Sequence, residues 1–223
     1  KWAKKRELLI VNALSDIYAK EDLGIEKNRV NRILDDEEIT MVLMAIDESK
    51  ILPKNKIFLK LCLMFGCRNG ELRKAKKQDF DLKKKVWIVP VENNKVGKKT
   101  GREIIRPILP EMEDLIIEAM EHNNSEYFLT NDNADTPMGN GASIALPANV
   151  MERLRRHHDY HMKHWTLHDL RRIARINFSA FTSRDVAELM IGHVMPGEQG
   201  TYDYYEYIPQ QTEAYTKWLD KLT

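Results

Sequence analysis

Four short segments place a charged or nucleophilic side chain beside a glycine or a turn, where it can face a bound ligand. FGCRNGEL carries an arginine between two glycines, and ENNKVGKKTGR carries three lysines. WTLHDLRRIAR places a histidine three residues before an arginine, on one face of a predicted helix. MIGHVMPGEQGTYDYYEY carries a histidine and, nine residues later, a tyrosine. Guanidinium and ammonium groups bind anions, imidazole exchanges protons near neutral pH, and a phenol can act as a nucleophile. The side chains are Arg68, Lys95, Lys98, Lys99, His168, Arg171, His193 and Tyr202.

Each of these side chains, taken alone, also has an ordinary structural explanation. Arg68 could be an exposed arginine at a helix end, and Lys95 could be a solvated lysine at a hairpin tip. His168 and Arg171 could belong to a capped helix start. Tyr202 could be a half-buried packing aromatic, since three further tyrosines follow it closely. A function can therefore be inferred only from the order of the four segments and from their occurrence together in one chain.

Positive charge is unevenly distributed along a chain whose formal net charge is only +1. Residues 68–106 contain thirteen Lys/Arg and five Asp/Glu, and residues 151–175 contain seven and three, so the rest of the chain is acidic. This segregation is typical of a polyanion-binding surface on an otherwise acidic protein. A solvated basic surface without a partner is the alternative that charge alone leaves open.

Hydrophobic periodicity predicts a mainly α chain with one small antiparallel β-sheet, an α+β fold. Two strands lie on either side of the lysine-rich turn within residues 86–109, and residues 70–82 continue as a polar helix and turn. Residues 127–146 are rich in Asn, Asp, Gly and Pro and predict a surface loop. The predicted helices are 2–20, 34–49, 57–65, 111–120, 148–161, 167–181, 184–191 and 210–222.

The length of 223 residues suits one main domain with a small appendage. A polar, Gly-containing stretch follows the first predicted helix, so we expect a short segment at residues 1–33 and a main domain at residues 34–223. Because the chain starts at Lys1 rather than Met, we expect a fragment. Two cysteines are too few for a disulfide framework or a zinc site, which fits a reducing cytoplasm. No apolar run is long enough to span a bilayer, and no signal-peptide pattern is present.

The order of the four segments resembles the active-site motifs of the tyrosine recombinases, specifically the integrases of phages and genomic islands. G-x-R-x-x-E-L comes first, a lysine-bearing hairpin second, H-x-L-R-R third, and G-H followed nine residues later by Tyr comes last. WIVPVENNK is similar to the integrase hairpin in which a lysine follows a Trp-x-x-Pro strand. The tail TYDYYEYIPQQTEAYTKWLDKL is similar to the tyrosine-bearing segment and closing helix of those enzymes. The resemblance covers residues 34–223.

This resemblance implies the catalytic-domain fold of the tyrosine recombinases. It implies a site-specific recombinase that cleaves and rejoins DNA through a covalent 3′-phosphotyrosyl intermediate, for integration or excision of a phage or mobile element. Residues 1–33 would then hold a remnant helix of a core-binding domain and a linker. The implied catalytic set is Arg68, Lys95, His168, Arg171, His193 and Tyr202, with Glu71 supporting the site.

Strand cleavage without a metal or another cofactor requires a division of labour among these residues. A tyrosine that stays attached to DNA keeps the phosphodiester energy for religation. The planar guanidinium groups of Arg68 and Arg171 suit the charge that develops on the phosphate oxygens, and the histidines add hydrogen bonds. A hairpin lysine can protonate the leaving 5′ oxygen, and Lys95 is favoured by its position after the strand. His168 is the expected acceptor or relay of the Tyr202 proton.

Several assignments stay open on the sequence alone. Tyr204, Tyr205 and Tyr207 compete with Tyr202 on chemistry, and the family spacing from the preceding histidine selects Tyr202. Residues 157–164 contain histidines at helical spacing that could hold a metal, although no HExxH pattern accompanies them. We expect this stretch to join a DNA-facing surface instead. The expected DNA-binding residues are Lys98, Lys99, Arg102, Arg153, Arg155, Arg156 and Lys163.

The expected partner is double-stranded DNA with attachment sites, bound by a homotetramer on two duplexes, with a monomer when the protein is alone. Accessory DNA-bending or directionality proteins fit the family, no membrane partner is expected, and the expected location is the nucleoid in the cytoplasm of a bacterial host. Helix 210–222 has an apolar face that could pack within the chain or exchange between protomers. A type IB topoisomerase and a non-catalytic DNA-binding protein of this fold are the alternatives. The integrase-like closing segment argues against the first, and the complete catalytic set argues against the second.

Overall fold

The computed structural model describes residues 4–8, 22–24, 32–95, 97, 101–131, 135–193 and 207–223. The chain divides into two compact units, Lys1–Arg32 and Ile33–Thr223. In the first unit the structure describes a short 3-10 helix, η1 (Lys4–Arg6). The rest of the helix that we predict for residues 2–20 lies outside the described residues.

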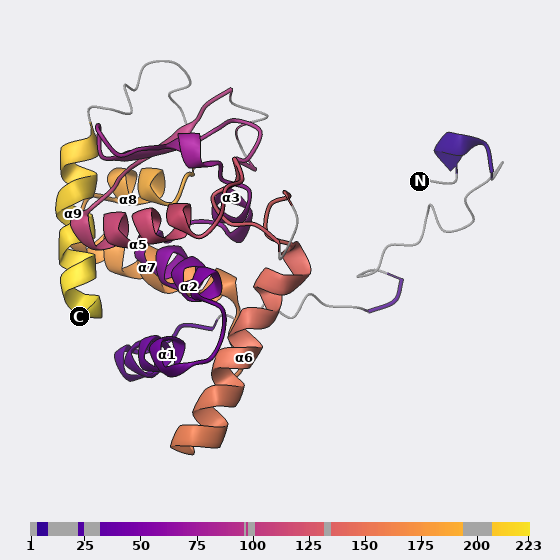
Figure 1. Cartoon of the computed structure of the whole chain (residues 1–223), viewed down its shortest axis with the longest axis vertical. Helices are drawn as coiled ribbons and strands as arrows, with labels where there is room; N and C mark the ends of the chain where they lie inside the picture. The colour runs from indigo at the N-terminus through magenta and orange to yellow at the C-terminus, as the bar shows by residue number, and fades with distance from the viewer. Residues whose placement is uncertain are drawn as a thin grey trace. The chain divides into compact units, whose positions relative to one another are not determined.

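The second unit is mostly helical, as the hydrophobic periodicity predicts (Figure 1). A capping box between Asp35 and Glu38 starts α1, and a proline occupies the first turn of α2, α5 and α9, where its missing N–H costs nothing. The helices are α1 (Asp36–Glu48), α2 (Pro53–Phe65), α3 (Asn69–Arg73), η2 (Lys77–Asp79), α5 (Pro110–Glu121), α6 (Asn140–His158), α7 (Leu167–Phe181), α8 (Arg184–Met190) and α9 (Ile208–Leu222).

One antiparallel sheet with the order β1-β2-β3 packs against these helices. Its strands are β1 (Phe80–Asp81), β2 (Val86–Val89) and β3 (Ile104–Pro107). The predicted pair of strands around the lysine-rich turn is confirmed, whereas β1, which has two residues in a polar stretch, is not predicted. The register pairs Trp87 with Phe80 on one side and with Arg106 on the other.

The core is built around α2, which packs against α5, α7 and α9. Figure 1 shows α9 along one edge of the second unit, beside α7 and α8. Tyr215 and Trp218 of α9 are fully buried, and their polar atoms donate to the carbonyls of Phe65 (3.1 Å) and Leu63 (3.2 Å) at the end of α2. The closing helix is therefore docked within its own chain in this structure.

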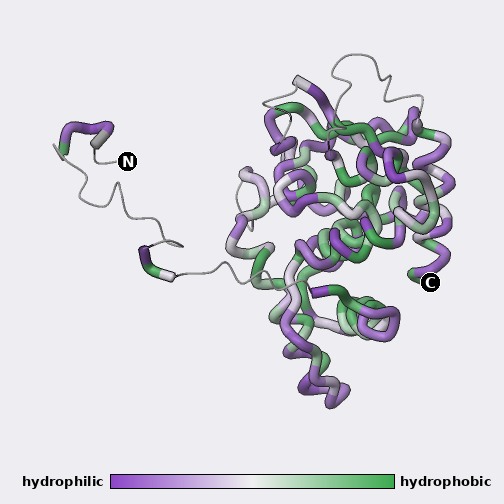
Figure 2. Tube along the Cα trace, turned by 180° about the vertical axis from the view of Figure 1, so that it is seen from behind, coloured by the Kyte–Doolittle hydropathy of each residue, from purple (hydrophilic) through white to green (hydrophobic). Residues whose placement is uncertain are grey.

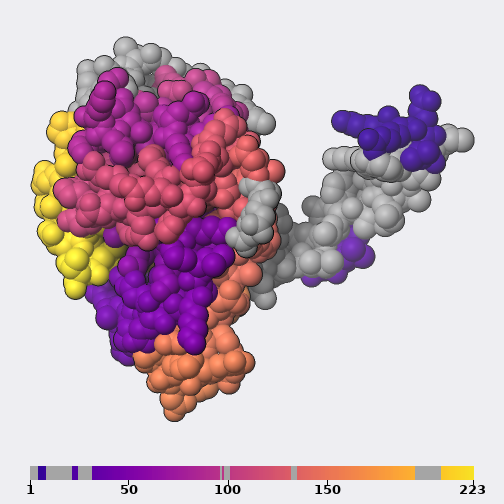
Figure 3. All heavy atoms as spheres, viewed as in Figure 1, coloured from indigo at the N-terminus to yellow at the C-terminus, as the bar shows by residue number. Residues whose placement is uncertain are grey.

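Helix α6 departs from the sequence prediction at both ends. It begins at Asn140, inside the predicted loop 127–146, and contains Pro147. Leu146, Val150 and Leu154 recur every four residues and are buried, so packing outweighs the weak helix propensity of the first turns. The helix ends at His158 rather than at residue 161, because Asp159 is left-handed, with a φ of 47°. Figures 2 and 3 show that its last turns are hydrophilic and project at the edge of the second unit.

Candidate active site

Arg68 lies at the turn between α2 and α3. Helix α2 ends at Gly66, which has a left-handed φ of 59°, and a Cβ atom at this position would lie 2.9 Å from the Cβ of Ala174 on α7. Glycine is required here both by the backbone conformation and by the close approach of α7. The turn places Arg68 at the start of α3 and leaves the Gly66 carbonyl within reach of α7.

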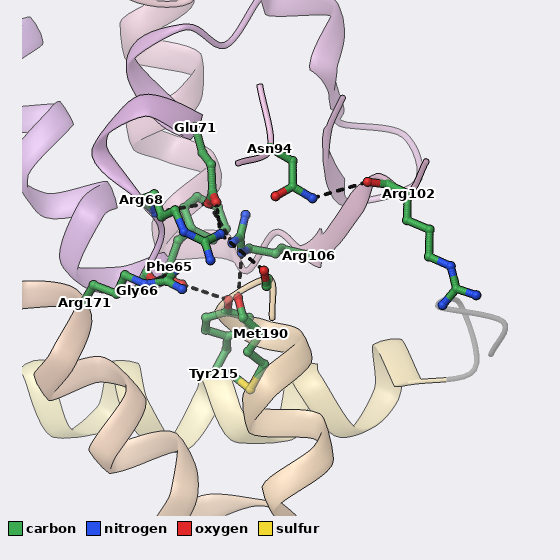
Figure 4. Close-up of polar contacts among 11 residues, drawn as sticks. Phe65, Gly66, Arg68, Glu71, Asn94, Arg102, Arg106, Arg171, Met190 and Tyr215 are labelled. Atoms are coloured by element: carbon green, nitrogen blue, oxygen red, sulfur yellow. Dashed lines mark hydrogen bonds and ion pairs between the residues drawn. The ribbon is translucent and has the colours of Figure 1, made fainter. Parts of the chain in front are cut away.

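Glu71 is a buried carboxylate shared between two arginines (Figure 4). Arg68 Nη1 donates to Glu71 Oε1 at 2.7 Å, and Arg106 Nη2 donates to Glu71 Oε2 at 2.9 Å. Burial by itself raises the pKa of Glu71, but the charges of Arg106, Arg68 and Arg171 outweigh it and hold the pKa below its ordinary value. Glu71 is thus an anion that fixes the guanidinium of Arg68.

Arg171 extends from α7 to the same place. A capping box between Thr166 and Asp169 fixes the first turn of α7, and Arg171 Nη1 donates to the carbonyl of Gly66 at 3.0 Å. Its Nη2 is buried and has no hydrogen-bond partner within the described part of the chain. Burial, followed by the repulsion from Arg68, lowers the pKa of Arg171 to about 10. The guanidinium therefore stays charged at neutral pH and keeps a donor for an anion.

Arg68, Arg171, His168 and Lys95 line one cleft of about 490 Å³. Burial, followed by the charges of Arg172 and Arg171, lowers the pKa of His168, so its imidazole is neutral at neutral pH and can accept a proton. The other lining residues come from the turn before α3 and the start of α3, from α6, and from the segment that enters α7 and its first residue; they are Cys67, Asn69, Gly70, Ile144, Pro147, Ala148, His164, Trp165, Thr166 and Leu167.

His193 lies beside this cluster, directly after α8. Gly192, which precedes it, has a φ of 68°, and its carbonyl accepts a hydrogen bond from Arg68 Nη1 at 3.2 Å. His193 Nδ1 donates to Glu188, which also accepts from Arg175. Burial lowers the pKa of His193, the bond to Glu188 opposes this shift, and Arg171 adds to it. The backbone of the G-H motif is thereby tied to Arg68.

Three of the predicted site residues, Tyr202, Lys98 and Lys99, lie outside the described residues. Arg102 is described: its carbonyl accepts from Asn94 Nδ2 at 3.3 Å, and its side chain points away from the arginine cluster (Figure 4). The structure therefore brings together Arg68, Lys95, His168, Arg171, His193 and Glu71, and it leaves the position of the expected nucleophile open.

The predicted DNA-binding residues of α6 are paired with carboxylates. Arg153 contacts Glu48 at 3.5 Å, while Arg155 and Arg156 share Glu152, and Lys163 beyond the helix is exposed. Their role on DNA stays a prediction. Within the described ranges, no group of three His, Cys, Asp or Glu side chains could hold a metal ion, and this includes the histidines of residues 157–164.

Sequence reasoning missed two residues that organise the site. Arg106 lies on β3 among apolar residues and is 0% exposed, and Glu188 precedes His193 by five residues on α8. The signal for Arg106 was a single charge inside the apolar run IIRPIL, because a charge in a buried strand demands a buried partner. Glu188 carried no signal, since an acidic residue on a short helix is ordinary.

Comparison with known families gives the class of protein to which this site belongs. The sequence profile of the phage integrase family matches residues 32–203. The chain therefore belongs to the phage integrase family, the site-specific tyrosine recombinases that act on DNA. A search of curated proteins found no match. None of the described helices is long and apolar enough to cross a membrane.

Solved structures of recombinases share the fold. The Tn1549 transposon integrase in complex with a circular intermediate DNA matches with a TM-score of 0.65 and 16% identity, over 86% of this chain and 67% of that chain. A lambda integrase dimer bound to a COC′ core site matches with a TM-score of 0.59 and 18% identity, over 89% of this chain and 53% of that chain. XerA recombinase matches with a TM-score of 0.58 and 15% identity, over 88% of this chain and 67% of that chain. The predicted α+β fold is confirmed as that of tyrosine recombinase catalytic domains.

Proposed function

We propose that this recombinase cleaves and rejoins DNA strands through a covalent bond between Tyr202 and a 3′ phosphate. The observation that carries the proposal is the meeting of Arg68 and Arg171 at one cleft, with a buried Arg171 donor that has no partner in the described chain. Three guanidinium groups surround the single carboxylate of Glu71, so the cluster keeps an excess of positive charge. A scissile phosphate would satisfy both the charge and the donor.

The proton transfers are assigned to His168 and to a hairpin lysine. A tyrosine phenol has an unperturbed pKa of about 10, so attack at neutral pH needs a proton acceptor. The lowered pKa of His168 supports its assignment as that acceptor. Lys95 lines the cleft and is exposed, which supports it as the donor to the leaving 5′ oxygen, with Lys98 and Lys99 as the competing assignments. The arginines, rather than metal ions, would neutralise the phosphate.

The second part of the proposed function is the protein assembly that acts on complete attachment sites. We propose a homotetramer on two duplexes, formed from monomers, that integrates or excises a mobile element with accessory DNA-bending or directionality proteins at the host nucleoid. Residues 1–33 would be the remnant of a core-binding domain with its linker, and residues 34–223 the catalytic domain. On DNA, α9 would dock onto a neighbouring protomer through the same apolar residues that pack it against its own chain here.

The test is the formation of a covalent adduct. Wild-type protein is mixed with a nicked half-site duplex that carries the attachment sequence, which is read from the junctions between the element and the host DNA. We expect an SDS-resistant complex that Tyr202→Phe abolishes and that Tyr204→Phe, Tyr205→Phe and Tyr207→Phe, as matched controls, leave in place. An adduct of equal yield with Tyr202→Phe would refute the assignment. Recombinant product from two-site substrates separates a recombinase from a topoisomerase.

A further inference from the structure

Arg106 is a buried arginine that none of the predicted catalytic roles uses. Its side chain is 0% exposed, it lies on β3, and its guanidinium carbon is 5.1 Å from the ring centroid of Trp87 on the paired strand. A buried guanidinium loses its hydration, so it needs compensating contacts. The contacts of Arg106 therefore have to offset the cost of burying its charge.

Its contacts reach two segments that carry active-site residues. Nη2 donates to Glu71 Oε2 at 2.9 Å, and the same carboxylate binds Arg68 through its other oxygen. Nε donates to the carbonyl of Met190 at 2.8 Å, at the end of α8 and three residues before His193. Figure 4 shows Arg106 between Glu71 and Met190. The planar guanidinium of Arg106 thus connects α3 to the end of α8 through two hydrogen bonds.

The backbone at Gly192 lies close against β3. A Cβ atom at Gly192 would overlap Cδ1 of Ile104 and lie 3.4 Å from Arg106 Nη2. The carbonyl of Gly192 in turn accepts from Arg68 Nη1. Hydrogen bonds therefore link Arg106, Glu71 and Arg68 to the carbonyls of Met190 and Gly192.

We propose that Arg106 is a positioning residue: through Glu71 it fixes the guanidinium of Arg68, and through the Met190 carbonyl it fixes the backbone that carries His193. Because it is fully buried, it acts through these groups and does not touch DNA. The proposal rests on the proposed function, since it assigns Arg68 and His193 to the phosphate. A lysine cannot replace the fork, because a single ammonium lacks the rigid set of donors that joins both partners.

The test compares Arg106→Met and Arg106→Lys with Arg73→Met, each checked for a cooperative thermal transition. Arg73 is a matched control, because this partly buried arginine also donates to a backbone carbonyl, that of Met138 at 2.7 Å, and does not line the cleft. We expect Arg106→Met to slow single-turnover cleavage of the half-site on the order of 10²-fold, as for other remote misplacements, with a much smaller change in DNA affinity. Arg106→Lys should be intermediate, and Arg73→Met should cleave at the wild-type rate.

Two further readouts separate positioning from a general loss of stability. In the Glu71→Gln background the effect of Arg106→Met should shrink, because the two act as one unit. The pKa of the Glu71 carboxylate, followed by ¹³C NMR, should rise in Arg106→Met, because Glu71 loses a cationic neighbour while Arg68 and Arg171 stay. Full additivity with Glu71→Gln and an unchanged pKa of Glu71 would overturn the proposal. If Arg106→Met does not fold, wild-type rates in a folded Arg106→Lys overturn it.

A measurement without DNA keeps this inference separate from the proposed function. The ¹⁵N signal of the Arg68 Nε–H group should shift or broaden in both Arg106 variants and stay unchanged in Arg73→Met. If wild-type protein forms no adduct, the proposed function fails, whereas the positioning of Arg68 still stands or falls on this signal. An unchanged Arg68 signal in both folded Arg106 variants overturns the positioning role.

Discussion

Replacement of Arg171 by lysine removes a donor fork from the cleft while it keeps the positive charge. In the wild-type chain, Nη1 donates to the Gly66 carbonyl at 3.0 Å, and Nη2 is buried without a hydrogen-bond partner among the residues described. A lysine has one nitrogen on a flexible stem, so it can hold the Gly66 carbonyl or reach a phosphate oxygen, but it cannot do both in a fixed geometry.

The magnitude follows from the loss of one preorganised donor. Removing a single donor to the charge that develops in a transition state typically slows the reaction by about 10²–10³-fold, which corresponds to about 2.7–4 kcal/mol. The burial that lowers the pKa of Arg171 to about 10 would also disfavour the charged form of a lysine at this position, which adds to the loss. DNA affinity should change far less than the rate, because the effect belongs to the transition state.

Single-turnover cleavage of the nicked half-site measures this loss directly. The matched control is Arg172→Lys, since Arg172 is the next residue on α7 and pairs with Asp169 outside the cluster. We expect Arg172→Lys to cleave within about threefold of wild type, because the lysine keeps the positive charge beside Asp169 and position 172 does not line the cleft. Cleavage by Arg171→Lys at a near wild-type rate, or a rate loss matched by an equal loss of DNA affinity, would refute the reasoning.

Three further perturbations test other parts of the account. Glu188→Gln should move the NMR titration midpoint of His193 to lower pH, because the carboxylate raises the pKa that burial lowers; a midpoint that stays or rises contradicts this assignment. Lys95→Ala should slow cleavage of an ordinary phosphodiester, and a 5′-thiolate leaving group, which needs no proton, should restore the rate; without such rescue, Lys95 is not the proton donor. Trp218→Ala should lower the free energy of unfolding by about 3–5 kcal/mol in a urea melt, because the indole is fully buried and bonded to Leu63; a loss below about 1 kcal/mol would show that α9 does not dock in its own chain.

The parts of the fold that depend on local pattern could be predicted from the sequence. Helix α7 has the predicted bounds 167–181, because its apolar face repeats every three to four residues and a threonine caps it. The two main strands and the lysine-rich connection between them are also as predicted. In contrast, the start of α6 depends on burial of Leu146 and Ser143 against other elements, which no local pattern encodes.

The residues of the candidate site that belong to sequence motifs could be predicted from the sequence. Arg68, His168 and Arg171 line one cleft and His193 follows the glycine bonded to Arg68, although up to 125 positions separate them, because glycine turns and helix starts bring these segments together. Arg106 was not predicted, since its partners are distant in sequence and its strand looks like ordinary core. The role of Tyr202 was inferred from its spacing after the G-H motif.

Peptide mapping of the trapped adduct tests the central claim most directly. Cleavage of the wild-type adduct with trypsin and nuclease, followed by fragmentation mass spectrometry, locates the modified tyrosine within the peptide Asp185–Lys217. The account predicts one phosphodeoxynucleotide on Tyr202, attached through the 3′ phosphate. A modification on Tyr204, Tyr205 or Tyr207, or an attachment through a 5′ phosphate, would contradict it.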